Sequence, residues 1–296
     1  MVRLRLRVAV AGLCLTGSLL GQVEPARPLP DTRAFLEDVR KNIRSDESLL
    51  DQYTFTEEFI EKRLDAKGRV KKSKRETYEV YPSYEPGKLY RRLVARDGKR
   101  LSETELAEQD RKQEERTEKR ERRRSSEDAA ARQKRLAREE ERRLREQRVV
   151  DEVFLMDEIV VVGREMIDGR PTVIVDFTPK PDYRPVTQGA KTIQKIQGRA
   201  WIDEADRELV RLETRLLDNM GVGPARVARL QSGSSGYFQR RKVNGEIWLP
   251  SEASFTGAAK MLLFFGARVE LSSRYSDYKK FSVGTDEEIT AVQGDD

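Results

Sequence analysis

The feature that most limits the fold of this chain is a run of fifty residues, Leu101 to Val150, in which thirty side chains are charged. Sixteen of them are basic and fourteen are acidic, and the run contains neither proline nor glycine. So much charge cannot be buried in a core, and Glu, Arg, Lys, Gln and Ala all favour a helix. The run is therefore predicted to be a long solvated helix, and the core must come from the residues on either side of it.

Local signals support this helix. Ser102 and Glu105 fit the capping box that satisfies free amides at a helix start, while Ser125 and Ser126 mark a place where the helix could fray. Apolar residues are too sparse for a coiled-coil seam, since the main ones are Leu106, Leu136 and Leu144. Acid-first pairs four residues apart stabilise such a helix by about 0.2 to 0.5 kcal/mol each; they are Glu115 with Lys119, Glu118 with Arg122, Asp128 with Arg132, Glu139 with Arg143, and Glu141 with Arg145.

The rest of the chain is almost neutral. Without this run and the three arginines that precede residue 8, 39 basic and 38 acidic residues remain. The formal net charge of +6 therefore does not predict a basic nucleic-acid-binding domain. The chain also has no histidine, which excludes Ser-His-Asp and Cys-His nucleophiles, histidine zinc sites and an imidazole base. We expect no enzyme, no cofactor and no metal.

The N-terminus is typical of an export signal. Three arginines in the first seven residues precede thirteen uncharged residues, Val8 to Leu20. As a helix this stretch would measure roughly 20 Å, too short for a permanent transmembrane span. Cys14 follows Leu13 rather than the small residue of a lipobox, so lipidation of Cys14 is the lesser alternative. Export to the periplasm or the outer-membrane periphery of a Gram-negative bacterium is the prediction.

The remaining segments predict one helix followed by hairpins. Asp31 can cap a helix whose apolar residues Phe35, Leu36, Val39 and Ile43 share one face. From Tyr53 onward the hydrophobic period is two, which predicts antiparallel strands. Turns are expected at Ala66-Lys67-Gly68, Asp97-Gly98, Asp168-Gly169, Glu204-Ala205-Asp206 and Asn244-Gly245, and the last two strands at Met261 to Leu271 and Ser272 to Phe281.

The predicted fold class is α+β and mainly antiparallel β. It consists of one strongly curved sheet, a half-barrel of about ten or eleven strands, with an N-terminal amphipathic helix and the long charged helical insertion. The predicted segments are a signal peptide at 1–22, the helix and first strands at 31–100, the insertion at 101–150, the other strands of the same half-barrel at 151–283, and an acidic disordered tail at 284–296.

Several motifs resemble those of the lipoprotein-carrier superfamily, which includes the LolA/LolB-like lipoprotein-sorting proteins. They are the helix and strand from Phe35 to Phe59, the hairpin from Val161 to Pro179, and Ile196-Gln-Gly-Arg-Ala-Trp-Ile-Asp followed by Glu208-Leu-Val-Arg-Leu-Glu. The resemblance covers about two thirds of the chain. It implies a half-barrel closed by helices at its mouth and a role in binding, with no catalytic residue.

A concave sheet face with apolar side chains can hold an acyl chain or an apolar segment of a partner. The candidate residues for such a face are Phe55, Phe59, Val173, Val175, Phe177, Trp201, Leu212, Leu216, Met261, Leu263 and Phe265. Plain core packing is the alternative for each of them, and a register slip of one residue would exchange the two faces.

The leading hypothesis is thus an exported, non-enzymatic protein that binds a lipid, an acyl chain or a lipidated partner. The alternative is an interaction protein whose charged helical arm docks to another envelope component. An enzyme is the least favoured class. Carboxylate pairs such as Asp203 with Glu204 or Asp206 have the groups needed for acid/base or metal chemistry, but their position at a hairpin tip predicts a turn instead.

Overall fold

The computed structural model describes residues 27–42, 52–83, 88–222, 228–261 and 264–280 of the chain. Strands dominate these residues. The part before the charged run contains α1 (Thr32–Asn42), β1 (Tyr53–Leu64), β2 (Val70–Pro82), β3 (Leu89–Arg96) and β4 (Lys99–Arg100). The charged run folds into α3 (Glu103–Ser125) and α4 (Ala129–Met156).

The part after the charged run adds the other strands and one short helix. It contains β5 (Asp157–Ile167), β6 (Arg170–Pro179), α5 (Gln188–Ile193), β7 (Ile196–Asp203), β8 (Leu209–Leu216), β9 (Met220–Val222), β10 (Ala228–Leu230), β11 (Ser235–Val243), β12 (Ile247–Met261) and β13 (Phe264–Lys280).

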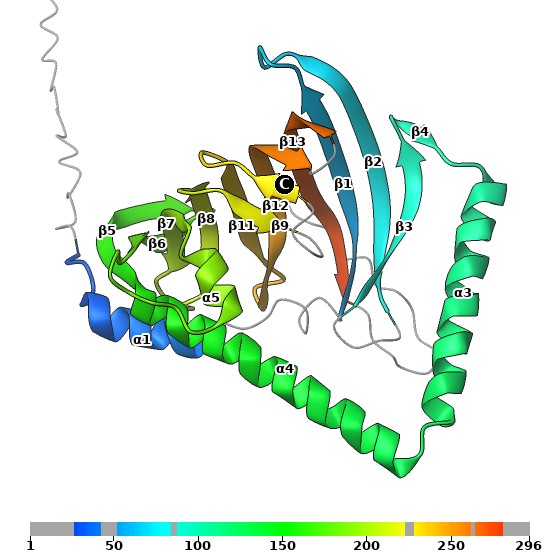
Figure 1. Ribbon diagram of the computed structural model, residues 1–296, viewed down its shortest axis with the longest axis horizontal. Helices are drawn as coiled ribbons and strands as arrows, with labels where there is room; N and C mark the ends of the chain where they lie inside the picture. Colours follow the sequence, from blue (N-terminus) through cyan, green and yellow to red (C-terminus); the bar gives the residue numbers. More distant parts are fainter. Residues whose placement is uncertain (1–26, 43–51, 84–87, 223–227, 262–263, 281–296) are drawn as a thin grey trace, which may run out of the picture.

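A single antiparallel sheet contains all of these strands. Eleven of them follow one path in the order β4-β3-β2-β1-β13-β12-β11-β8-β7-β6-β5, and β9 and β10 branch off from β12. The pairing of β1 with β13 joins the first strands of the chain to the last one. The two outermost strands, β4 and β5, are not paired with each other in the described part, so the curved sheet is an open half-barrel (Figure 1).

Turn chemistry explains the hairpins. Three two-residue turns have positive φ at both positions: Asp97-Gly98 (48° and 78°), Asp168-Gly169 (48° and 72°) and Asn244-Gly245 (53° and 66°). Both central residues of a type I′ turn need this backbone conformation, which Asn, Asp and Gly tolerate best. The turns predicted at these three places are confirmed.

The N-terminal helix also begins where it was predicted. The side chain of Asp31 accepts a hydrogen bond from the backbone N–H of Ala34 at 2.9 Å, which is the expected N-cap contact. Phe35 and Val39 are buried, and Leu36 packs beside them. Ile43 lies outside the described residues.

The charged run is two helices rather than one. Its capping box at Ser102 and Glu105 is present, but α3 ends at Ser125 and α4 begins at Ala129. The hydroxyls of Ser125 and Ser126 donate to the carbonyls of Arg122 and Arg123, both at 3.1 Å. Asp128 caps α4 by accepting from the N–H of Ala131 at 2.7 Å. These competing side-chain bonds end one helix and start the next, so the chain turns at this elbow (Figure 1).

The final hairpin differs from its prediction. β12 runs to Met261 and β13 begins at Phe264, whereas one strand was predicted from Met261 to Leu271 and the next from Ser272. Ser272 was predicted to begin the last strand, yet Ser272 and Ser273 lie within β13, opposite Ile60 and Phe59. The hydroxyl of Ser273 donates to the carboxylate of Glu57 at 2.8 Å, which satisfies a polar side chain inside the sheet.

Candidate functional site

Strand register assigns each side chain to one of two sheet faces, because residues directly opposite each other in an antiparallel pair point to the same side. We call the side that carries Val175 and Phe59 the inner face. One row of directly paired residues crosses it from β5 to β3: Val161, Val175, Ala200, Leu212, Phe238, Ala253, Ser273, Phe59, Glu76 and Arg96. The row is apolar from β5 to β12 and becomes polar and charged toward β3.

Most of the candidate residues lie on this inner face. Alternation along β1, β6 and β8 places Phe55, Phe59, Val173, Val175, Phe177, Leu212 and Leu216 on it. Met261 and Phe265 lie on β12 and β13, whereas Leu263 lies outside the described residues.

Trp201 lies on the opposite, outer face. Its partners across the ladder are Ile174 and Arg211, and its ring packs in a cluster with Ile167, Val210 and Trp248. The indole N–H donates to the carboxylate of Glu165 at 2.7 Å. Trp201 is therefore a packing residue of the outer face and does not join the other candidates.

Helix α1 covers the inner face over β6 and β7. Phe35 and Val39 pack against Val173, Val175 and Ala200, and all five side chains are buried. Phe154 of α4 joins the same cluster, and Arg40 of α1 binds Asp151 of α4 at 2.7 Å. Packing thus accounts for the candidates Val173 and Val175, whereas Leu212 is only half-buried at the margin of this cluster.

A second cluster fills one end of the other half. Phe55 lies in it with Tyr53, Val80, Leu249 and Tyr278, and all five are buried. The rings of Phe55 and Tyr278 lie 5.1 Å apart. Phe55 is therefore also a core residue.

Between the two clusters the inner face carries apolar side chains that are only half-buried. We call this set the open apolar strip; it consists of Phe59, Leu212, Phe238, Phe255 and Leu271. Phe238, Phe255 and Leu271 were missed from the sequence, although each follows the period of two in its strand. Their inward phase depends on the pairing of distant strands, which no local pattern reveals.

The strip is bordered by ionised groups toward β2 and β3. Glu57 is 7% exposed, pairs with Arg91 at 2.7 Å and accepts from Ser273. Burial alone raises the pKa of Glu76, yet hydrogen bonds from Lys74 and Tyr78 outweigh it and hold that pKa below its ordinary value. Burial, together with the hydrogen bond to Glu76, raises the pKa of Tyr78 to about 12. Glu76 is therefore held in its ionised form at this border of the strip.

The carboxylates considered for chemistry are all engaged in the hairpin tip. Asp203 is fully buried, accepts from the backbone N–H of Ala205 at 3.0 Å and of Asp206 at 2.7 Å, and forms a bidentate pair with Arg170. Glu204 pairs with Arg164 at 2.9 Å. Asp206 accepts from Lys242 at 2.7 Å and from the indole of Trp248 at 2.8 Å.

The two charged helices form a strap between the two edges of the sheet. At one edge Arg92 of β3 makes two 2.8 Å bonds to Asp110 of α3. Gln109 there bonds both the N–H and the carbonyl of Leu93, at 3.1 and 3.0 Å. At the other edge the buried carboxylate of Glu152 accepts from the backbone N–H groups of Val186 and Thr187. The arm expected from the sequence is thus fastened at both ends.

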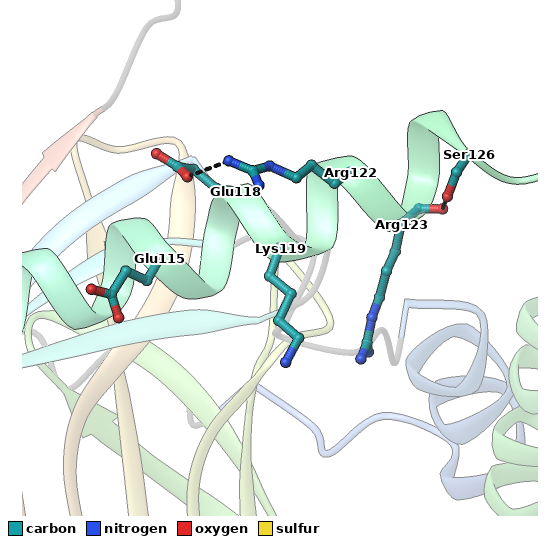
Figure 2. Close-up of a pocket in the computed structure, with 6 residues that line it drawn as sticks. All are labelled: Glu115, Glu118, Lys119, Arg122, Arg123 and Ser126. Atoms are coloured by element: carbon teal, nitrogen blue, oxygen red, sulfur yellow. Dashed lines mark hydrogen bonds and ion pairs between the residues drawn. The ribbon is translucent and has the colours of Figure 1, made fainter.

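The middle of the strap is exposed and charged. Glu118 and Arg122 pair at 3.2 Å, while Lys119 and Arg123 point together away from that pair (Figure 2). These residues, with Glu115 and Ser126, line a shallow hollow of about 430 Å³. Of the five predicted pairs, Glu118 with Arg122 and Glu141 with Arg145 are present. Glu115 instead pairs with Arg111, and Asp128 serves as a helix cap.

No family model and no curated protein match the chain. Several solved structures are similar to it. They include a DUF1329 family protein from Desulfovibrio piger (11% identity, 86% of this chain and 94% of that chain, TM-score 0.32), an outer membrane lipoprotein-sorting protein domain from Vibrio parahaemolyticus (12%, 86% and 93%, 0.28) and a LolA superfamily protein from Nitrosomonas europaea (12%, 86% and 96%, 0.25). Within the described residues, no helix has the length and apolar character needed to cross a bilayer.

Proposed function

We propose that this protein is an exported, non-enzymatic binding protein of the bacterial envelope that takes a lipid, an acyl chain or a lipidated partner onto the open apolar strip. The observation that carries the proposal is the half-buried state of Phe59, Leu212, Phe238, Phe255 and Leu271 on one continuous face. Contiguous apolar surface left in contact with water is typical of a binding site.

The dimensions of the strip suit an extended hydrocarbon chain. It crosses β8, β11, β12, β13 and β1, which are neighbours in the sheet. Strands lie about 4.8 Å apart, so five of them span roughly 19 Å. Each methylene buried along that path stabilises a complex by about 0.8 kcal/mol. A long acyl chain laid across the strands would therefore supply enough binding free energy without any polar contact.

Export rests on the N-terminal sequence. The arginine-rich start and the thirteen uncharged residues that follow are typical of a signal peptide, which we place at residues 1–22. Removal of that peptide would deliver the sheet to the periplasm or the outer-membrane periphery, where lipids and lipidated proteins are available as ligands.

A second candidate function is docking of an envelope protein to the strap. Lys119 and Arg123 favour it, because they share one side of α3 and make no ion pair among the described residues. Like charges four residues apart destabilise a helix slightly. An acidic partner surface would relieve that repulsion.

Native mass spectrometry of the processed protein, purified from the envelope that produces it, tests the leading proposal. We expect a fraction of the molecules to carry a lipid-sized adduct, because the strip would otherwise contact water. A protein without adduct that also shows no mass shift after phospholipid or acylated peptide is added would rule out the proposal.

Replacing Phe59 by serine tests which face binds. We expect the Kd for a fluorescent fatty acid to rise about tenfold, because a large part of an aromatic contact is lost. Ile60→Ser is the matched control, since Ile60 is the next residue of β1, is also half-buried and points to the outer face. Equal changes in the two variants would show that the inner face is not the site.

A further inference from the structure

One hairpin carries a large local excess of basic over acidic residues. Residues 62–75 contain eight lysines and arginines and one acid, Asp65. Their formal charge of +7 exceeds the formal charge of +6 of the entire chain. The rest of the chain is nearly balanced, so the totals do not reveal this local excess. These residues form the end of the β1–β2 hairpin, which projects past β3 at the top of Figure 1.

The single acid is used by the turn itself. Asp65 accepts from the backbone N–H of Lys67 at 2.8 Å and of Arg69 at 3.0 Å, and from the guanidinium of Arg69 at 2.8 Å. Its hydrogen bonds to Arg69 hold the pKa of Asp65 below the ordinary value, so it remains ionised and paired. Its hydrogen bonds are thus made within the turn, and the charge of Lys71 lowers the pKa of Asp65 further.

Three lysines at this end form no ion pair in the described part of the chain. Lys67, Lys71 and Lys72 are exposed and form no ion pair among the described residues, whereas Lys62 pairs with Glu270 and Lys74 with Glu76. Lys71 and Lys72 are consecutive in β2, so they point to opposite faces of the hairpin. Only a surface that meets the hairpin end-on can contact both.

The hairpin end also carries an exposed apolar side chain next to these lysines. Val70 is 55% exposed. An anionic bilayer is a flat surface that attracts lysine side chains and also takes up apolar ones. A hairpin that meets it end-on can therefore use both kinds of side chain.

We propose that the end of the β1–β2 hairpin docks this protein onto an anionic phospholipid surface. The inference goes beyond the proposed function and does not depend on it, because surface docking requires none of the residues of the open apolar strip. Each lysine or arginine held near such a surface is worth about 1 kcal/mol, and the attraction falls off within a Debye length of roughly 8 Å at physiological salt.

The test is co-sedimentation of the protein lacking residues 1–22 with vesicles of phosphatidylcholine containing about one third phosphatidylglycerol, and with pure phosphatidylcholine. We expect binding to the anionic vesicles only, with loss in 0.5 M NaCl. The variant Lys67→Gln, Lys71→Gln, Lys72→Gln is expected to bind at least tenfold more weakly. Its circular dichroism and thermal transition should match those of the parent, because all three side chains are exposed.

The matched control removes three charges from the strap: Lys119→Gln, Arg123→Gln, Lys134→Gln. These residues are also exposed and form no ion pair in the described part of the chain. Retained vesicle binding in this variant supports the hairpin as the docking element. Equal weakening of the two variants, absence of binding to anionic vesicles, or binding that resists salt would each overturn the proposal. Fatty-acid binding by the hairpin variant, measured in parallel, separates failure of this inference from failure of the proposed function.

Discussion

Gly198→Ala is expected to destabilise the protein by about 3 kcal/mol, or to prevent it from accumulating in soluble form. A Cβ at this position would lie 2.1 Å from the backbone oxygen of Glu213 and 2.7 Å from the ring of Phe177. The oxygen belongs to the neighbouring strand β8 and cannot rotate away as a side chain would. The β7–β8 ladder would have to separate locally, and Phe177 would lose its place above the glycine.

Urea unfolding followed by circular dichroism measures the effect as a fall in the midpoint. Gly163→Ala is the control, since Gly163 lies two strands away on β5 and its Cβ would meet only the Cδ1 of Ile174 at 3.7 Å. We expect that variant to stay within about 1 kcal/mol of the parent. A Gly198→Ala protein as stable as Gly163→Ala would show that β7 and β8 are farther apart than described.

Local chemistry explains what could be predicted from the sequence. Asp-Gly and Asn-Gly turns, the Asp31 cap and the Ser102 capping box depend on residues a few positions apart, and each is found where it was predicted. The candidates on β1, β6 and β8 also share one face, as the alternation within each strand requires. The sequence does not reveal to which face Trp201 points. Its outer cluster includes Trp248, which is 47 positions away in the chain, so no local pattern could predict it.

The role of the charged run could not be read from its own residues. Its composition predicts a solvated helix, and most of its side chains are indeed exposed. Whether such a helix is an arm or a strap depends on where the strands before and after it lie in the sheet. Because β1 pairs with β13, β4 and β5 become opposite edges, and α3 and α4 must connect them. That pairing joins residues more than 200 positions apart and has no local signature.

Charge totals over long segments also failed to reveal the hairpin with the largest local excess of bases. The body outside the charged run appeared neutral because its bases and acids are nearly equal in number. Eight of those bases nevertheless lie in residues 62–75, where Asp65 is the one acid. A charge count over about fourteen residues, the length of one hairpin end, reveals this excess of bases.

Asp157→Asn is expected to stabilise the protein at pH 7 by about 2 kcal/mol, because it removes a charge that the fold buries without a partner. Asp157 is 3% exposed at the junction of α4 and β5, and neither carboxylate oxygen has a hydrogen-bond partner among the described residues. Burial raises its pKa from 3.8 to about 6, although the charge of Lys180 acts in the opposite direction. The folded protein therefore holds this proton more tightly than the unfolded chain does.

The pH dependence follows from that difference. The contribution of Asp157 to stability is fully present below pH 3.8 and is lost as the pH rises through about 6, where the folded carboxyl ionises. Urea midpoints measured from pH 4 to pH 7 should show this loss in the parent and not in Asp157→Asn. Asp176→Asn on the adjoining strand should have the opposite sign, since Arg199 binds Asp176 at 2.6 Å and lowers its pKa. A stabilised parent at pH 7 relative to Asp157→Asn would mean that a counter-charge reaches this junction. In that case an ion pair of Asp157 would hold the strap at β5. Without a counter-charge, the junction is instead most stable when the carboxyl of Asp157 is protonated.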